Sequence, residues 1–202
     1  MEKKPQMVLF AGPNGSGKTR LYQMRFADKS LKDIEYINPD DYSKKYGSDL
    51  RGAREAIKRR NELIASRTSF VTESTLSGSS ALKLIDKANM AGFKTSLIYV
   101  GTLNPTINVR RVKTRVMQGG HDVPKQAIVR RYHDSLKNLA AAVQRSNISH
   151  VFNSSDRGGT IRLFSAKNGY VRPREGKAMP SWVPEKLVKK VMRRTASKGR
   201  TR

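Results

Sequence analysis

The sequence predicts a three-layer α/β fold with a central, mostly parallel sheet of about five strands and a C-terminal hairpin. Short apolar runs alternate with longer helical patterns, which is typical of parallel sheets. A glycine-rich turn at 12–17 joins the first apolar run to a helical pattern, a connection that suits phosphate binding. The length of 202 residues suits one domain. We expect a body at 1–171 and a basic tail with a short helix at 172–202.

Five apolar runs have the length and composition of buried strands. They are 7–11, 35–37, 69–72, 95–100 and 150–152. Each is short, and all but 35–37 are bounded on both sides by polar or glycine residues, which favours strands over buried helices. The five runs therefore predict the strands of the parallel sheet.

The end of the body predicts a hairpin. The segments 160–166 and 170–171 flank Asn168-Gly169, a pair that is typical of tight turns between antiparallel strands. After it, three prolines precede a basic helix candidate at 185–194.

Two helices are indicated between the last two strands of the parallel sheet. Asn104-Pro105 begins the first, because asparagine caps a helix and proline fits its first turn, and Gly119-Gly120 ends it. The second begins at Pro124 and carries one apolar stripe. The members of that stripe are Ile128, Tyr132, Leu136, Leu139 and Val143.

The charge balance predicts an anionic partner. The chain has 41 Lys and Arg against 16 Asp and Glu, a net charge of +25. From Arg172 onward there are 11 basic and 2 acidic residues, so the tail is especially basic. Nucleic acid, a phosphorylated metabolite and an acidic protein all fit such a charge.

Several classes of protein are excluded or disfavoured by composition. No cysteine is present, which excludes disulfides, thiolate metal sites and thiol nucleophiles. No apolar run approaches the ~18 residues of a membrane span, and the first residues do not resemble a signal peptide. We therefore expect a cytoplasmic protein without a membrane partner.

Residues 12–19 match the P-loop pattern G-x-x-x-x-G-K-[ST] between a strand and a helix. They are Gly12, Pro13, Asn14, Gly15, Ser16, Gly17, Lys18 and Thr19. In such a loop backbone N–H groups surround phosphate oxygens, the lysine neutralises the β- and γ-phosphates, and the hydroxyl ligates Mg²⁺. We therefore expect ATP or GTP with Mg²⁺, with Lys18 in the catalytic set and Thr19 as the metal ligand.

Three acidic residues follow predicted strands at the edge where the P-loop lies. Asp40 and Asp41 come just after 35–37, and Glu73 follows 69–72. Ligands of open parallel sheets bind beyond the carboxyl ends of the strands, so a carboxylate there can orient an acceptor hydroxyl and take its proton. The alternatives are that Asp40 or Asp41 caps the following helix and that Glu73 is an ordinary surface acid.

Basic residues on the two helices are candidates for holding a triphosphate. Arg115 and Arg131 flank the apolar stripes of their helices, and Arg111 lies slightly farther round. Guanidinium groups at such positions stabilise charge on the transferring phosphoryl group. A solvated basic face is the alternative. His121, in the glycine-rich joint between the helices, either contacts the nucleotide or caps a helix.

The order of these motifs resembles the zeta toxins, and most closely their shorter bacterial members. The resemblance covers about residues 6–155 and is carried by 8–19, 37–40, 70–75, 111–116, 119–124 and 130–132. It implies a P-loop kinase-like fold and transfer of a phosphoryl group from ATP or GTP to a sugar hydroxyl. For the best-known members the acceptor is UDP-N-acetylglucosamine, and an acidic antitoxin is a candidate partner.

The resemblance also implies roles for single residues. Asp40 matches the catalytic base, and Glu73 and Thr75 match contacts with the sugar nucleotide. Asn38 and Asp41 adjoin this set and are expected to bind substrate. His121 stands where the family has an arginine, so Arg131 is expected to supply that contact.

A second interpretation is a P-loop protein associated with nucleic acid, either a polynucleotide or tRNA kinase or a binding module that uses ATP. Trp182 and Tyr170 could stack on bases, although a lone tryptophan also serves to pack a core. Because the candidate catalytic residues all precede residue 150, we expect that ending the chain after Val171 leaves catalysis nearly intact and weakens any nucleic-acid binding.

Overall fold

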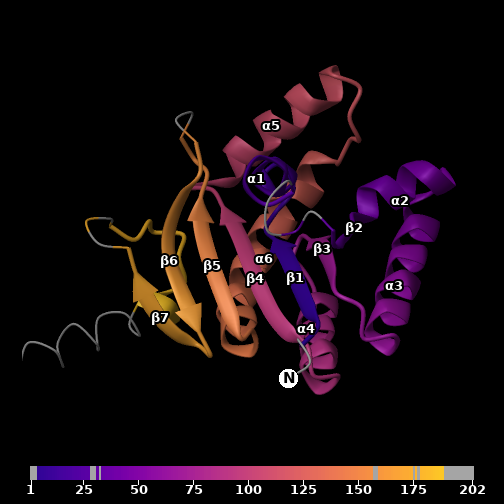
Figure 1. The fold of residues 1–202 in the computed structure, drawn as a ribbon. Coiled ribbons are helices and arrows are strands. Elements are labelled where there is room, and N and C mark those ends of the chain that lie inside the picture. The colour runs from indigo at the N-terminus through magenta and orange to yellow at the C-terminus, as the bar shows by residue number, and fades with distance from the viewer. Residues whose placement is uncertain are drawn as a thin grey trace, which may run out of the picture.

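The computed structural model describes residues 4–27, 31, 33–156, 159–174, 176 and 178–188. Within them one sheet has seven strands in the order β2-β3-β1-β4-β5-β6-β7 (Figure 1). The strands are β1 Gln6–Ala11, β2 Glu35–Ile37, β3 Phe70–Ser74, β4 Lys94–Gly101, β5 Ile148–Asn153, β6 Ile161–Lys167 and β7 Tyr170–Pro173. β1 to β5 pair in parallel, and β6 and β7 add antiparallel pairs. The predicted α/β class, the parallel strands and the hairpin are confirmed.

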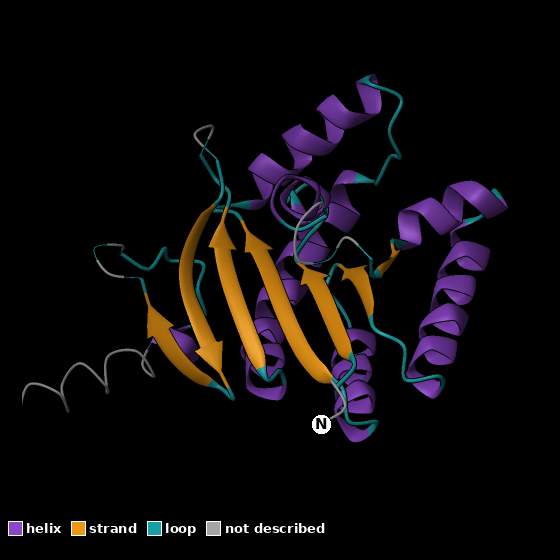
Figure 2. Ribbon diagram, in the orientation of Figure 1, coloured by secondary structure: helices purple, strands orange, loops and turns teal. Residues whose placement is uncertain are grey.

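Helices lie on both faces of the sheet and beyond its upper edge. They are α1 Lys18–Arg25, α2 Pro39–Tyr46, α3 Asp49–Ala65, α4 Ser80–Met90, α5 Pro105–Met117 and α6 Lys125–Arg145. Figure 2 shows α1 on one face, α4 and α6 on the other, and α2 and α3 beside the β2 end of the sheet. The helices predicted after Asn104 and Pro124 are α5 and α6.

The alternation along β1 explains why the sheet needs cover on both sides. Met7 and Leu9 belong to the large core cluster under α3, α4 and α6, whereas Val8 and Phe10 belong to a second cluster with Leu21 of α1. Successive side chains of a strand point to opposite faces. A strand that is apolar at every position is therefore stable only between two layers of helices.

Part of the segment predicted as a basic tail packs into the core. Trp182 is 6% exposed, and its ring lies 6.0 Å from that of Tyr99. Val183 and Leu187 join the same core cluster. Trp182 is thus a packing anchor and is not available to stack on bases, and the predicted boundary at 171 falls inside β7.

The predicted helix at 185–194 is described only at its start. Residues 185–188 are helical, and the remainder lies outside the described residues. No helix in the described part of the chain is long and apolar enough to cross a membrane.

Candidate active site

The site lies at the edge of the sheet where the parallel strands end. The P-loop follows β1, Asn38 follows β2, and Glu73 stands next to the last residue of β3. The register aligns Ile37, the last residue of β2, with Thr72 and Leu9, so β2 ends two residues before β1 and β3 and all three strands end at the same edge of the sheet. This is the edge at which open parallel sheets bind ligands.

The turn of the P-loop requires glycine at its first position. Gly12 has φ +138°, and a Cβ there would lie 2.1 Å from the carbonyl oxygen of Val100. The turn brings Lys18 back over the loop, where its Nζ donates to the carbonyl oxygens of Gly12 and Pro13 at 2.9 and 3.3 Å. Burial lowers the pKa of Lys18, and the nearby carboxylates of Glu73 and Asp40 oppose that shift.

Asn14 of the P-loop is held by two helices. Asn108 of α5, which is fully buried, donates from Nδ2 to the carbonyl oxygen of Asn14 at 2.7 Å. Arg131 of α6 donates to the side-chain oxygen of Asn14 at 3.1 Å. The loop is therefore fixed to the helices that were predicted to clamp a triphosphate.

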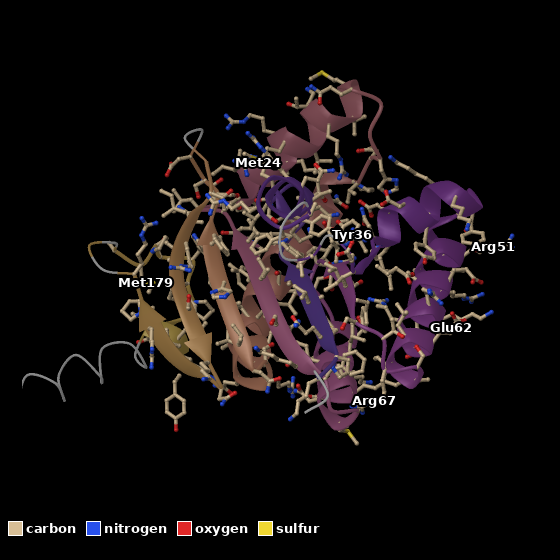
Figure 3. The ribbon with its side chains drawn as sticks, in the orientation of Figure 1. Met24, Tyr36, Arg51, Glu62, Arg67 and Met179 are labelled. Atoms are coloured by element: carbon tan, nitrogen blue, oxygen red, sulfur yellow. The ribbon has the colours of Figure 1, made fainter. Side chains whose placement is uncertain are left out.

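Glu73 accepts two hydrogen bonds on one oxygen. Thr19 donates to its Oε1 at 2.8 Å, and the hydroxyl of Tyr36 donates to the same atom. The ring of Tyr36 is stacked on that of Tyr22, with centroids 4.1 Å apart and an angle of 5° between the planes. Burial and the Glu73 carboxylate raise the pKa of Tyr36, which keeps it a donor. Figure 3 shows Tyr36 near the upper edge of the sheet, between α1 and α2.

The oxygen atoms at this point fit Mg²⁺. Because the Thr19 hydroxyl gives its proton to Glu73, its lone pairs remain free to ligate a cation. Mg²⁺ prefers oxygen ligands and takes only one or two from the protein when phosphates supply others. The described residues accordingly contain no group of three or more His, Asp or Glu that could hold a metal by themselves.

A first cavity of about 410 Å³ opens on the acidic side of the P-loop. Eight of the predicted site residues line it: Asn14, Lys18, Asn38, Asp40, Glu73, Thr75, His121 and Arg131. Asn38 caps α2 and accepts from the backbone N–H of Asp40 at 3.1 Å, so the Asp40 carboxylate is not the cap of that helix. Asp41 is exposed and does not line this cavity.

Arg115 approaches the first cavity from the joint between α5 and α6. Its Nη1 lies 3.8 Å from Oδ2 of Asp40, and its Nη2 donates to the carbonyl oxygen of His121 at 2.6 Å. Its buried Nε has no hydrogen-bond partner among the described residues. His121, which is predicted among the nucleotide contacts, lines the first cavity together with Lys18, and its Nε2 lies 3.8 Å from Oδ2 of Asp49.

A second cavity of about 520 Å³ lies on the other side of the P-loop. Ser16 and Gly17 line it together with Arg20 of α1 and Arg111 of α5. Arg111 donates to the carbonyl oxygen and the hydroxyl of Ser154, at 2.5 and 3.1 Å. Burial lowers the pKa of Arg111, and repulsion from Arg110 and Arg20 adds to that shift. Such a concentration of cations favours an anionic ligand.

Several residues at the site were not predicted from the sequence. Asn108 could have been found from the sequence, because it lies one turn from Val112 on the apolar face of the helix, and a polar side chain buried there needs an internal hydrogen-bond partner. Tyr36 and Ser154 carried none, since their roles depend on strands that meet only in the folded chain.

Known proteins resemble this chain over most of its length. A family model described as Zeta toxin matches residues 1–168. An uncharacterised protein of Haemophilus influenzae is 32% identical over 130 residues, which are 62% of this chain and 91% of that protein. The range matched by the family model includes the P-loop and the residues that line the first cavity.

Two solved structures share the fold at low sequence identity. The AvrRxo1-ORF1:-ORF2 complex with ATP aligns with a TM-score of 0.72 and 16% identity, over 93% of this chain and 63% of that one. This chain thus spans less than two thirds of its AvrRxo1 counterpart. The PezAT toxin-antitoxin system of Streptococcus pneumoniae aligns with a TM-score of 0.58 and 14% identity, over 95% and 80%. Since the family model matches far more than half of the 202 residues, the chain belongs to the zeta toxin family, and this family and its P-loop kinase fold support a nucleotide-dependent kinase.

Proposed function

We propose that the protein transfers the γ-phosphoryl group of ATP or GTP to a hydroxyl of a small molecule, of the UDP-N-acetyl sugar type. One observation carries this proposal: the P-loop lysine, Lys18, and the carboxylate of Asp40 line the same cavity. A donor phosphate and an acceptor hydroxyl bound there would lie side by side. The UDP-sugar acceptor is supported by the family to which the chain belongs.

The two cavities suggest how the nucleotide lies. Lys18 lines the first cavity, so the γ-phosphate belongs on that side. The nucleoside then extends into the second cavity, where Ser16, Gly17 and Arg111 follow the P-loop. The acceptor fills the rest of the first cavity, on the far side of the γ-phosphate as in-line transfer requires.

Asp40 acts as the base in this mechanism. Its carboxylate accepts the proton of the acceptor hydroxyl while the acceptor oxygen bonds to the γ-phosphorus. The bond from that phosphorus to the bridging oxygen breaks, and the nucleoside diphosphate leaves. Arg115 places its Nη1 3.8 Å from Oδ2 of Asp40, so a positive charge lies beside this carboxylate during the transfer.

Cations around the P-loop offset the charge of the transferring group. When the nucleotide binds, the Nζ of Lys18 exchanges its hydrogen bonds to the carbonyl oxygens of Gly12 and Pro13 for bonds to phosphate oxygens. Arg131, which donates to Asn14 of the P-loop, adds a second positive charge nearby. Thr19, with Glu73 behind it, would hold Mg²⁺, which would supply further positive charge to the phosphate groups. Preorganised charges of this kind supply most of the rate enhancement in phosphoryl transfer.

Mass spectrometry of candidate acceptors incubated with the protein, ATP and Mg²⁺ tests this function. We expect one added phosphate on a UDP-N-acetyl sugar. The Lys18→Ala variant should be slower by about 10²–10³-fold, because it lacks a charge that stabilises the transition state. Wild-type turnover in that variant would contradict the role of the P-loop, and phosphate on no sugar nucleotide would contradict the acceptor class.

An acidic antitoxin is the proposed protein partner. The net charge of +25 favours an acidic surface, and the pneumococcal structure with the same fold comes from a toxin-antitoxin system. Co-expression with the product of an adjacent gene, followed by purification in low and high salt, would reveal such a complex.

Nucleic-acid binding is a second candidate function, favoured by a basic surface beside the nucleoside side of the P-loop. Arg25 lines the second cavity and also a third one of about 860 Å³, which Arg162 and Arg174 line as well. None of these three arginines forms an ion pair with a described residue. Binding of labelled RNA should therefore depend on this surface.

A pair of charge-matched variants tests this second candidate. One replaces the three arginines of the third cavity with alanine, and the other replaces Arg51, Arg54 and Lys58 of α3, which are exposed. If RNA binds at the third cavity, only the first variant should reduce the salt dependence of binding. Equal losses would show that the affinity reflects net charge alone.

A further inference from the structure

The first cavity extends well beyond the residues that serve phosphoryl transfer. One face of α3 lines it through Asp49, Ala53, Ile57 and Arg60. At about 1.5 Å per residue, these positions span roughly 16 Å along the helix. An acceptor longer than a single sugar ring can therefore lie against α3.

The cations that line the first cavity are not equally engaged. Lys18 lies near Glu73 and Asp40, and Arg131 donates to Asn14 of the P-loop. Arg60 has neither a nearby carboxylate nor a side-chain acceptor among the described residues. It uses only Nε, which donates to the carbonyl oxygen of Ala56 one turn earlier at 3.1 Å. No carboxylate of the described residues lies within ion-pair distance of it.

The neighbouring arginine on α3 shows the contrast. Arg59 is paired with Glu35 at 2.7 Å and with Glu62 at 3.1 Å, in an exposed position. Figure 3 shows Glu62 and Arg51 on the side of α3 that faces away from the sheet. Arg60 points to the opposite side, into the cavity, and neither of its Nη atoms has an acceptor among the residues that the structure describes.

Burial makes this arrangement unfavourable without a ligand. Arg60 is partly withdrawn from water, and burial lowers the pKa of its guanidinium. A bound anion would restore the interactions that solvent no longer supplies. Guanidinium groups match phosphate oxygens in a bidentate geometry, so phosphate is the anion that the free Nη atoms suit best.

The surroundings of Arg60 favour an anion as well. Ser77 and Ser80 line the same cavity, and Ser80 is the first residue of α4. No side-chain hydrogen bond from the described residues caps this helix, so its first N–H groups add positive potential beside the guanidinium. Ala53 and Ile57 supply an apolar wall for an uncharged part of the ligand.

We propose that Arg60 is a specificity residue that binds a phosphate group of the acceptor. The inference rests on the proposed function, because it takes the first cavity to be the acceptor site. It predicts that acceptors with a phosphate or diphosphate at a distance from the reacting hydroxyl bind far better than their neutral counterparts.

The test compares UDP with uridine, which lacks the diphosphate. Calorimetry would measure both affinities in protein whose P-loop is filled with Mg²⁺ and a non-hydrolysable ATP analogue. The wild type should bind UDP at least tenfold more tightly than uridine. Arg60→Gln should remove most of that preference while uridine binding changes less than about twofold. Arg60→Lys should keep part of it, since the charge remains without the planar fork.

Arg54→Gln is the matched control. Arg54 is exposed on the same helix and does not line the first cavity. Its replacement by glutamine removes the same charge as Arg60→Gln. This variant should keep the preference for UDP. An equal loss in both variants, or no preference in the wild type, would overturn the proposal.

Kinetics with an identified acceptor add an independent measurement. With a phosphate-bearing acceptor, Arg60→Gln should raise KM at least tenfold and change kcat far less, because the contact is made equally in the ground and transition states. An unchanged KM would overturn the role of Arg60. If the wild type phosphorylates nothing, the proposed function fails, while the UDP and uridine comparison still decides whether Arg60 binds phosphate.

Discussion

The Oγ1 atom of Thr19 lies 2.8 Å from Oε1 of Glu73, although 54 residues separate them in the chain. The contact joins the last residue of the P-loop to the third strand. It orients the threonine hydroxyl so that its lone pairs face away from the carboxylate. Tyr36 donates to the same oxygen from a neighbouring strand and fixes the carboxylate in turn.

Tyr36→Phe should weaken the apparent affinity for Mg²⁺ by about 10–100-fold, as is usual when an outer-shell partner is lost. The phenyl ring keeps the stack on Tyr22 but cannot hold Glu73 in place. Turnover measured against Mg²⁺ concentration would show the shift, with little change at saturating metal. Tyr170→Phe, on the exposed edge strand β7, is the control. An unshifted Mg²⁺ curve for Tyr36→Phe would show that Glu73 needs no support.

Asp40→Asn should abolish transfer and spare ATP affinity, because the amide keeps the shape of the side chain but cannot take the proton of the acceptor. Asp41→Asn should be mild, since Asp41 is exposed and does not line the first cavity. Steady-state kinetics and ATP binding measured in parallel separate the two effects. If Asp41 proved essential and Asp40 dispensable, Asp41 would be the base and its assignment to Asp40 would be wrong.

Gly101→Ala should lower the free energy of unfolding by about 1–3 kcal/mol through overpacking. A Cβ at this position would approach the ring of Trp182 to 2.5 Å. Thermal unfolding would measure the loss. Gly78→Ala is the control, because nothing lies within 4 Å of its Cβ position. Equal melting temperatures for both variants would mean that Trp182 does not pack on β4.

Ending the chain after Val171 should destabilise the protein, because it removes Trp182, Val183 and Leu187 from the core. Ending it after Val188 keeps these residues and should leave the melting temperature close to that of the full chain. Activity and melting measured together would separate loss of folding from loss of function. This outcome differs from the expectation based on sequence, in which everything after Val171 was separable from catalysis. A stable chain ending at Val171 would contradict the role of this segment in the core.

The sequence by itself determined the parallel sheet, the hairpin and the P-loop, because each depends on neighbours along the chain. The short apolar runs, the Asn168-Gly169 turn and the glycine spacing at 12–17 each depend only on residues that are close together in the sequence. The strand ends also predicted that Asp40 and Glu73 meet at one edge, since parallel strands share that edge.

Only the tertiary structure decided which of similar residues face the site. Asp40 rather than Asp41 lines the first cavity because Asn38 caps α2 and sets the rotation of that helix. Arg60 rather than Arg59 faces it because α3 packs against the sheet along one face. Trp182 is buried because the sheet leaves Gly101 bare beneath it. These outcomes depend on contacts between distant segments, and local pattern cannot specify which side of a helix meets a cavity that other elements form.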